Sequence, residues 1–130
     1  MIHRLIAYSL ILLGIGGTIY MAVKGIYSDE YATPSLSRGE AEAALEDSSE
    51  WIVIDVRTVA EFEEDPGFWN SAINIPLLAL EKRSVELAKL KAEQVLVVCP
   101  TGNRSRQGAR ILRMAGIKAY YLAGGLEGVN

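Results

Sequence analysis

The segment QVLVVCPTGNRSRQGARILRMAG, residues 94–116, joins a strand-like stretch to a helix-like one. Residues 94–99 are an apolar run rich in valine, which is typical of a strand buried within a parallel sheet. Residues 105–115 predict a helix that stops at Gly116 and turns inward the side chains of Ile111, Leu112 and Ala115. Because a strand followed by a helix is the repeating unit of parallel sheets, this segment favours an α/β fold.

The chain beyond residue 34 continues this alternation of helices and strands. Ser37 and Glu40 have the spacing of a capping box at the start of a helix. We therefore expect a doubly wound, mainly parallel sheet flanked by helices. In chain order, the predicted elements are a helix at 41–45, a strand at 51–56, a short helix at 59–65, a strand or extended segment at 72–76, an amphipathic helix carrying Leu77, Leu80, Leu87 and Leu90, and a last strand at 119–122.

Composition limits the classes of function. A chain of 130 residues has room for a single domain of ordinary size. Its formal net charge of −3 argues against nucleic-acid binding, which needs a basic surface. The chain has 1 cysteine and 1 histidine, which form neither an internal disulfide nor a zinc site of Cys and His ligands. We expect no metal, no cofactor and no nucleic-acid partner.

Residues 5–23 are an apolar stretch without a charge, flanked by Arg4 and Lys24. A helix of this length rises roughly 28 Å, which matches the hydrocarbon core of a bilayer. The stretch therefore predicts a single-pass membrane anchor followed by a juxtamembrane linker at 24–33, with the side of the soluble domain left open. A cleaved signal peptide and a buried helix of a soluble protein are the alternatives.

Two further features would suit contacts with a membrane protein complex. Gly14, Thr18 and Ala22 place small residues on one face of the expected anchor, where another helix could pack closely, although small residues are also common in such helices. Phe68 and Trp69 are large apolar residues in a polar loop, and they either pack on the core or form an exposed contact patch. Membrane lipid and a membrane complex are thus expected partners.

Cys99 stands at the carboxyl end of a predicted strand, directly before a loop of small residues and a helix. Ligands bind at this end of open α/β sheets, and backbone N–H groups at the start of a helix attract anions. The helix dipole and the charge of Arg104 both favour a thiolate over a thiol. A reactive cysteine therefore fits better than a core cysteine, and its chemistry needs no histidine base.

The chain contains, in this order, WIVIDVRTVAEF at 51–62, AINIPL at 72–77, VVCPTGNRS at 97–105 and YYLAGGLEG at 120–128. This series resembles the rhodanese, or sulfurtransferase, family, and the resemblance covers residues 34–130. It implies a five-stranded, mainly parallel sheet. It also implies that Cys99 takes a sulfane sulfur from a donor, holds it as a persulfide and passes it to an acceptor. The sulfur would be bound by the backbone of Thr101, Gly102, Asn103, Arg104 and Ser105.

The spacing between Cys99 and Arg104 separates two related activities. Dual-specificity phosphatases and arsenate reductases of similar fold have a loop one residue longer, which makes room for a tetrahedral oxyanion. The shorter loop of this chain favours sulfur transfer over phosphate hydrolysis. The uncharged Pro100 and Thr101 replace basic residues that often follow the cysteine in thiosulfate-preferring members, which puts thiosulfate in doubt as the donor.

Two functions remain open. The first is a membrane-anchored sulfurtransferase that works through a Cys99 persulfide, with a small molecule or a protein as sulfur donor and acceptor. The second is a non-catalytic accessory subunit of a larger membrane complex. Asp55 and Arg57 match the DVR stretch of the family, and we expect them to form a structural pair near the site. The segment 63–76 lacks the histidine that most members carry there, so access to the site is expected to differ.

Overall fold

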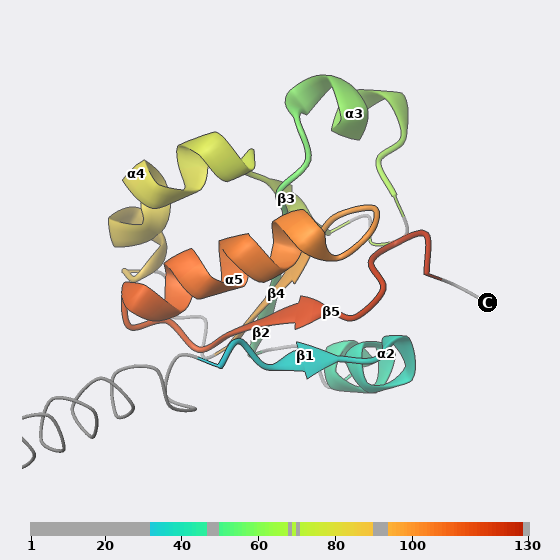
Figure 1. The fold of residues 1–130 in the computed structure, drawn as a ribbon, viewed down its shortest axis with the longest axis horizontal. Coiled ribbons are helices and arrows are strands. Elements are labelled where there is room, and N and C mark those ends of the chain that lie inside the picture. The colour runs from blue at the N-terminus through green and yellow to red at the C-terminus, as the bar shows by residue number, and fades with distance from the viewer. Residues whose placement is uncertain (1–31, 47–49, 68, 70, 90–93, 129–130) are drawn as a thin grey trace, which may run out of the picture. The chain divides into compact units, whose positions relative to one another are not determined.

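The computed structural model describes residues 32–46, 50–67, 69, 71–89 and 94–128, and Thr33–Asn130 forms one compact unit. Strands and helices alternate along the described chain, as the sequence predicts (Figure 1). The elements are β1 (Ser35–Leu36), α2 (Arg38–Glu46), β2 (Trp51–Asp55), α3 (Val59–Glu64), β3 (Ile73–Asn74), α4 (Leu77–Leu87), β4 (Gln94–Val98), α5 (Asn103–Met114) and β5 (Ala119–Leu122).

The strands form one five-stranded parallel sheet in the order β1-β5-β4-β2-β3. The central strand β4 pairs with β2 over its whole length, from Gln94 opposite Trp51 to Val98 opposite Asp55. Because parallel strands run the same way, the carboxyl ends of β2 and β4 meet at one end of the sheet. This confirms the predicted α/β fold with a five-stranded parallel sheet flanked by helices.

Helices cover both faces of the sheet. Val95 and Val97 of β4 pack with α4 and α5 on one face, whereas Leu96 and Val98 pack with α2 on the other. Since alternate residues of a strand point to opposite faces, a strand covered on both sides has to be apolar throughout. The unbroken apolar pattern of β4 therefore reflects burial on both faces.

Helix α2 begins at Arg38, earlier than the predicted range 41–45. The predicted capping box is present and sets this start. The backbone N–H of Ser37 donates to Oε2 of Glu40 at 2.8 Å, and the backbone N–H of Glu40 donates to Oγ of Ser37 at 3.4 Å. The cap satisfies N–H groups that the first helical turn leaves without a partner, so the helix extends back to the residue after the cap.

Helix α5 differs from its predicted range at both ends. It begins at Asn103, directly after Gly102, two residues earlier than expected. Ala115 is exposed rather than turned inward, because the helix ends at Met114 and the chain reverses at Gly116, where φ is 83°. The start of α5 therefore lies closer to the cysteine than the sequence pattern indicates.

The prediction of a single-pass membrane location is corrected by the structure. Among the described residues, no helix is long and apolar enough to cross a membrane. The longest of them, α5, has 12 residues and one apolar face, whereas a bilayer span needs about 20 apolar residues. The stretch 5–23, with its small residues Gly14, Thr18 and Ala22, lies outside the described residues. Membrane lipid as a partner has no support in the described part of the chain.

Candidate active site

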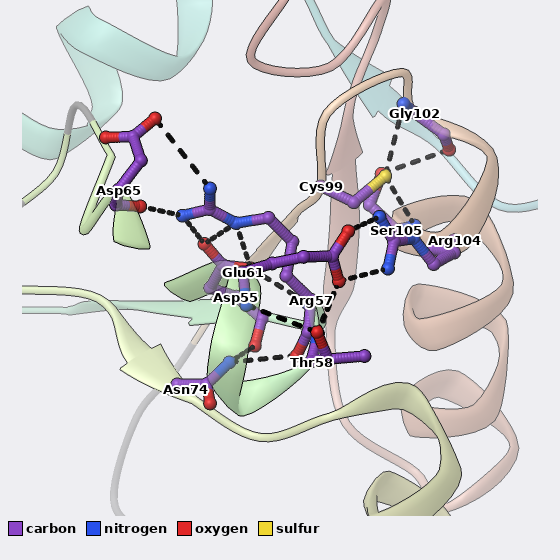
Figure 2. A network of polar contacts seen from close by, with 10 residues as sticks. All are labelled: Asp55, Arg57, Thr58, Glu61, Asp65, Asn74, Cys99, Gly102, Arg104 and Ser105. Carbon is purple, nitrogen blue, oxygen red and sulfur yellow. Dashed lines mark hydrogen bonds and ion pairs between the residues drawn. The ribbon is translucent and has the colours of Figure 1, made fainter. Parts of the chain in front are cut away.

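Cys99 directly follows β4, the central strand of the sheet, and its side chain is fully buried, with 0% exposure. The chain turns through a short loop and enters α5 at Asn103, so that the start of this helix faces the sulfur (Figure 2). The thiol thus occupies the end of the sheet at which ligands bind in parallel α/β folds. Residues 99–105 are called the sulfur cradle below.

The Sγ atom of Cys99 accepts two hydrogen bonds from the backbone. The N–H groups of Gly102 and Ser105 both donate to it at 3.2 Å. The thiol donates to the hydroxyl of Ser105 at 3.4 Å, and that hydroxyl donates to the carbonyl of Gly102 at 3.0 Å. Because two N–H donors converge on one sulfur at the positive end of the α5 dipole, the site stabilises negative charge on that sulfur.

The backbone of Gly102 has the conformation that aims its N–H at the sulfur. Its φ is 91°, a left-handed value that side chains disfavour. A Cβ added here would lie 3.3 Å from the carbonyl oxygen of Leu122 and 3.4 Å from the backbone nitrogens of Gly124 and Gly125. Strain and space both therefore require glycine at this position.

The turn after β5 is hydrogen-bonded to the first residues of the sulfur cradle. The N–H of Leu126 donates to the carbonyl of Cys99 at 2.9 Å, and the N–H of Glu127 donates to the carbonyl of Pro100 at 2.8 Å. Gly125 has φ of 70°, and a Cβ on it would overlap the Pro100 carbonyl. These contacts hold the first two residues of the cradle against the turn that follows β5.

The guanidinium of Arg104 is bound to Glu61 of α3 (Figure 2). Its two terminal nitrogens donate to the two carboxylate oxygens, each at 2.8 Å. Oε2 of Glu61 also accepts hydrogen bonds from the backbone N–H and the hydroxyl of Thr58, at 2.8 and 2.7 Å. These contacts raise the pKa of Arg104 and hold the pKa of Glu61 well below its ordinary value, chiefly through the hydrogen bonds between the two side chains.

A second ion pair lies at the end of β2. Nε of Arg57 donates to both carboxylate oxygens of Asp55, at 3.1 and 2.8 Å, and its NH2 lies 2.7 Å from Oδ2. Both side chains are buried, and the hydrogen bonds to Asp55 raise the pKa of Arg57. NH2 of Arg57 also donates to the carbonyl of Asp65 at 2.9 Å, while the side-chain amide of Asn74 donates to the carbonyls of Asp55 and Arg57. The pair thereby fixes the path of the chain beside the cradle.

A cavity of about 400 Å³ borders the cradle at Pro100. Arg57 and Gly67 are among the residues that line it, and Gly67 belongs to the segment 63–76, for which the sequence predicts a difference in access to the site. Trp69 of the same segment is half-buried and packs against the core cluster on the α2 face, and Phe68 lies outside the described residues.

The structure sorts the predicted site residues by their contacts with the sulfur. Gly102 and Ser105 bind it, whereas within the described chain the backbone N–H groups of Thr101, Asn103 and Arg104 make no hydrogen bond to it. Sequence reasoning missed the bond from Glu61 to Arg104 and the role of the Ser105 hydroxyl. The Thr-x-x-Glu spacing at 58–61 could have revealed the capping box, but it says nothing of the arginine.

Known proteins resemble this chain in sequence. A profile of the rhodanese-like domain matches residues 37–130. The putative sulfur carrier protein YrkF of Bacillus subtilis is 30% identical over 98 residues, which are 72% of this chain and 50% of that protein. The chain thus spans about half the length of this curated relative.

Solved structures of rhodanese-like proteins have a similar fold. A rhodanese-like domain protein from Staphylococcus aureus is 27% identical with a TM-score of 0.62, covering 74% of this chain and 90% of that one. A rhodanese homolog from the extremely thermophilic bacterium Thermus thermophilus is also 27% identical, with a TM-score of 0.58, covering 73% of this chain and 99% of that one. The profile covers most of the chain, the fold agrees, and the cysteine loop lies at the expected end of the sheet, so the chain belongs to the rhodanese-like domain family.

Proposed function

We propose that this protein is a sulfurtransferase that carries sulfane sulfur as a persulfide on Cys99. The observation that carries the proposal is the pair of N–H donors, from Gly102 and Ser105, that meet at a buried sulfur after the central strand. Such donors stabilise a thiolate, which is the nucleophilic form of cysteine. Family membership and the description of the Bacillus subtilis relative as a putative sulfur carrier support the same chemistry.

In the first half of the reaction, the Cys99 thiolate attacks the outer sulfur of a donor persulfide, R–S–SH. A new S–S bond forms as the S–S bond of the donor breaks, and the electron pair of the broken bond leaves with the donor as R–S⁻. The products are Cys99–S–SH and the donor thiolate. Atoms and charge balance, so the step needs no external oxidant or reductant.

The outer sulfur of the persulfide has its own donors in the cradle. The first N–H groups of a helix have no acceptor within the helix. Those of Asn103 and Arg104, together with the N–H of Thr101, make no hydrogen bond to any described residue. They are available to bind the outer sulfur while Gly102 and Ser105 hold the inner one.

In the second half, a thiolate of the acceptor attacks the outer sulfur and Cys99 leaves as a thiolate. The N–H groups of Gly102 and Ser105 stabilise the charge that returns to Sγ in this step. The same two contacts therefore assist both halves of the cycle, because each half begins or ends with a charged Sγ.

Two other functions fit less well. Phosphate hydrolysis needs a wider loop with an arginine aimed at the anion, whereas here Arg104 is bound to Glu61. A non-catalytic accessory role is not favoured, because it gives no reason for glycine in a left-handed conformation and two N–H donors around one sulfur.

A single-turnover transfer experiment on the full chain tests the proposal. The chain is loaded with cysteine persulfide, freed of donor by gel filtration, and mixed with a small thiol acceptor. We expect one persulfide to pass to the acceptor per loaded chain, and none from Cys99→Ser. The proposal would be wrong if the wild type transferred no sulfur, or if Cys99→Ser transferred as much as the wild type.

A further inference from the structure

Two arginines near the sulfur cradle, Arg57 and Arg104, are paired with carboxylates (Figure 2). Arg104 gives two hydrogen bonds to Glu61, and Arg57 is bound to Asp55. The two cradle residues that follow the cysteine, Pro100 and Thr101, carry no charge. The charges of these two arginines are therefore already balanced.

The position of Glu61 is fixed by its own helix. Its carboxylate caps α3 by accepting from the N–H and the hydroxyl of Thr58, while its backbone N–H donates back to that hydroxyl at 3.3 Å. Moving the carboxylate away from Arg104 would therefore also break the helix cap. Glu61 is thus held by Thr58 as well as by Arg104.

Arg104 lies within electrostatic reach of the sulfur. It is the second residue of α5, one position before Ser105, which binds Sγ through its N–H. The hydrogen bonds that Arg104 donates to Glu61 raise the pKa of Arg104 most, and a charge on Cys99 adds a smaller increase. An unpaired guanidinium here would attract an anionic donor, and Glu61 removes that attraction.

We propose that Glu61 sets donor specificity by occupying Arg104, so that the site disfavours donors that leave as oxyanions and accepts persulfides of thiols. This inference rests on the proposed sulfur transfer through Cys99. With thiosulfate, the Cys99 thiolate would attack the outer sulfur, the S–S bond would break, and sulfite would leave with the electron pair and two negative charges. A thiol persulfide releases a leaving group with only one negative charge at sulfur, so it depends less on a free cation.

The test compares second-order loading rates from thiosulfate and from cysteine persulfide, measured on the full chain by quenching and intact-mass analysis. In Glu61→Gln, the amide keeps the capping-box geometry but weakens the hold on Arg104. We expect the ratio of thiosulfate to persulfide loading to rise about five-fold in this variant. Glu63→Gln is the matched control, because it removes the same charge from an exposed position of the same helix. We expect its ratio to stay at the wild-type value.

Arg104→Ala supplies an independent test that does not depend on the folding of the Glu61 variant. Removal of Arg104 from the wild type leaves the Glu61 carboxylate near the cradle without its cation, so the loading ratio should not rise in Arg104→Ala. In the Arg104→Ala background, Glu61→Gln no longer frees a guanidinium, so it should raise the ratio less than it does when Arg104 is present.

Four results would overturn the inference: an unchanged ratio in a folded Glu61→Gln, an equal rise in Glu63→Gln, a rise in Arg104→Ala alone, or a rise by Glu61→Gln in the Arg104→Ala background as large as in the wild type. Failure of the proposed function looks different, because the wild type would then load from neither donor.

Discussion

The hydroxyl of Ser105 offers the sharpest test of how the cradle handles charge on the sulfur. With a neutral thiol, this hydroxyl accepts from Cys99 at 3.4 Å and donates to the Gly102 carbonyl at 3.0 Å. Once the sulfur is ionised, the hydroxyl can turn and donate to it instead. The turn leaves no carbonyl unpaired, since Gly102 also accepts from the N–H of Arg106 at 3.0 Å.

The expected effect of Ser105→Ala follows from these contacts. A hydrogen bond to a charged group contributes roughly 1.5–3 kcal/mol, and the long distance to sulfur favours the lower value. A loss of about 1.5 kcal/mol corresponds to about a ten-fold fall in the rate of sulfur loading. The neutral resting state loses two ordinary hydrogen bonds, so the free energy of unfolding should fall by about 1–2 kcal/mol.

Stopped loading reactions with cysteine persulfide, together with urea unfolding, measure both quantities on the full chain. Ser84→Ala is the matched control, because its buried hydroxyl donates to the Glu81 carbonyl at 2.7 Å and has no contact with the cradle. Loading by Ser105→Ala at the wild-type rate, or an equal slowing by Ser84→Ala, would refute the reasoning.

Three further predictions concern the supports of the site. Gly125→Ala should abolish most sulfur loading, because its new Cβ would displace the Pro100 carbonyl and with it the cradle; loading rate and a circular dichroism spectrum check this. Asp55→Asn leaves Arg57 buried without its charged partner, so urea unfolding should show a loss of about 3 kcal/mol. As the control for Asp55→Asn, Arg83→Gln breaks an exposed pair on α4 and should lower the free energy of unfolding by less than about 0.5 kcal/mol. Finally, the pKa of Glu61 lies below its ordinary 4.5, so its ion pair stabilises the fold fully above about pH 4.5 and less as the pH falls. The stability advantage of the wild type over Glu61→Gln in thermal melts should therefore shrink at acid pH; an advantage that grows there would contradict this.

The parts of the fold that sequence reasoning predicted are those set by local pattern. The residues of β4 are apolar because both faces of the strand are covered, and this pattern can be read without a structure. Cys99 could be placed at the ligand-binding end of the sheet, since it follows that strand and precedes a helix. The capping box of Ser37 and Glu40 was equally visible, because its residues are neighbours in the chain.

The features of the site that could not be predicted from the sequence depend on contacts between distant segments of the chain. Glu61 and Arg104 are 43 positions apart, and they meet because α3 follows β2 at the same end of the sheet from which α5 leaves β4. No periodicity in either helix predicts that contact. The hydrogen bonds from Leu126 and Glu127 to the cradle also join distant segments, since they form only because β5 lies beside β4.

The membrane location was wrong for a different reason. It was inferred from the uncharged stretch 5–23, which lies outside the described residues, and among the described residues no helix could span a membrane. The length and hydropathy of one stretch gave no information about the helices that build the rhodanese-like domain.

Intact-mass measurement after incubation with cysteine persulfide tests most directly whether Cys99 carries the sulfur. The full chain has 1 cysteine, so the position of any added persulfide is unambiguous. We expect a gain of one sulfur atom in the wild type, reversed by a thiol reductant and missing in Cys99→Ser. A wild-type mass that stays unchanged with this donor would contradict it.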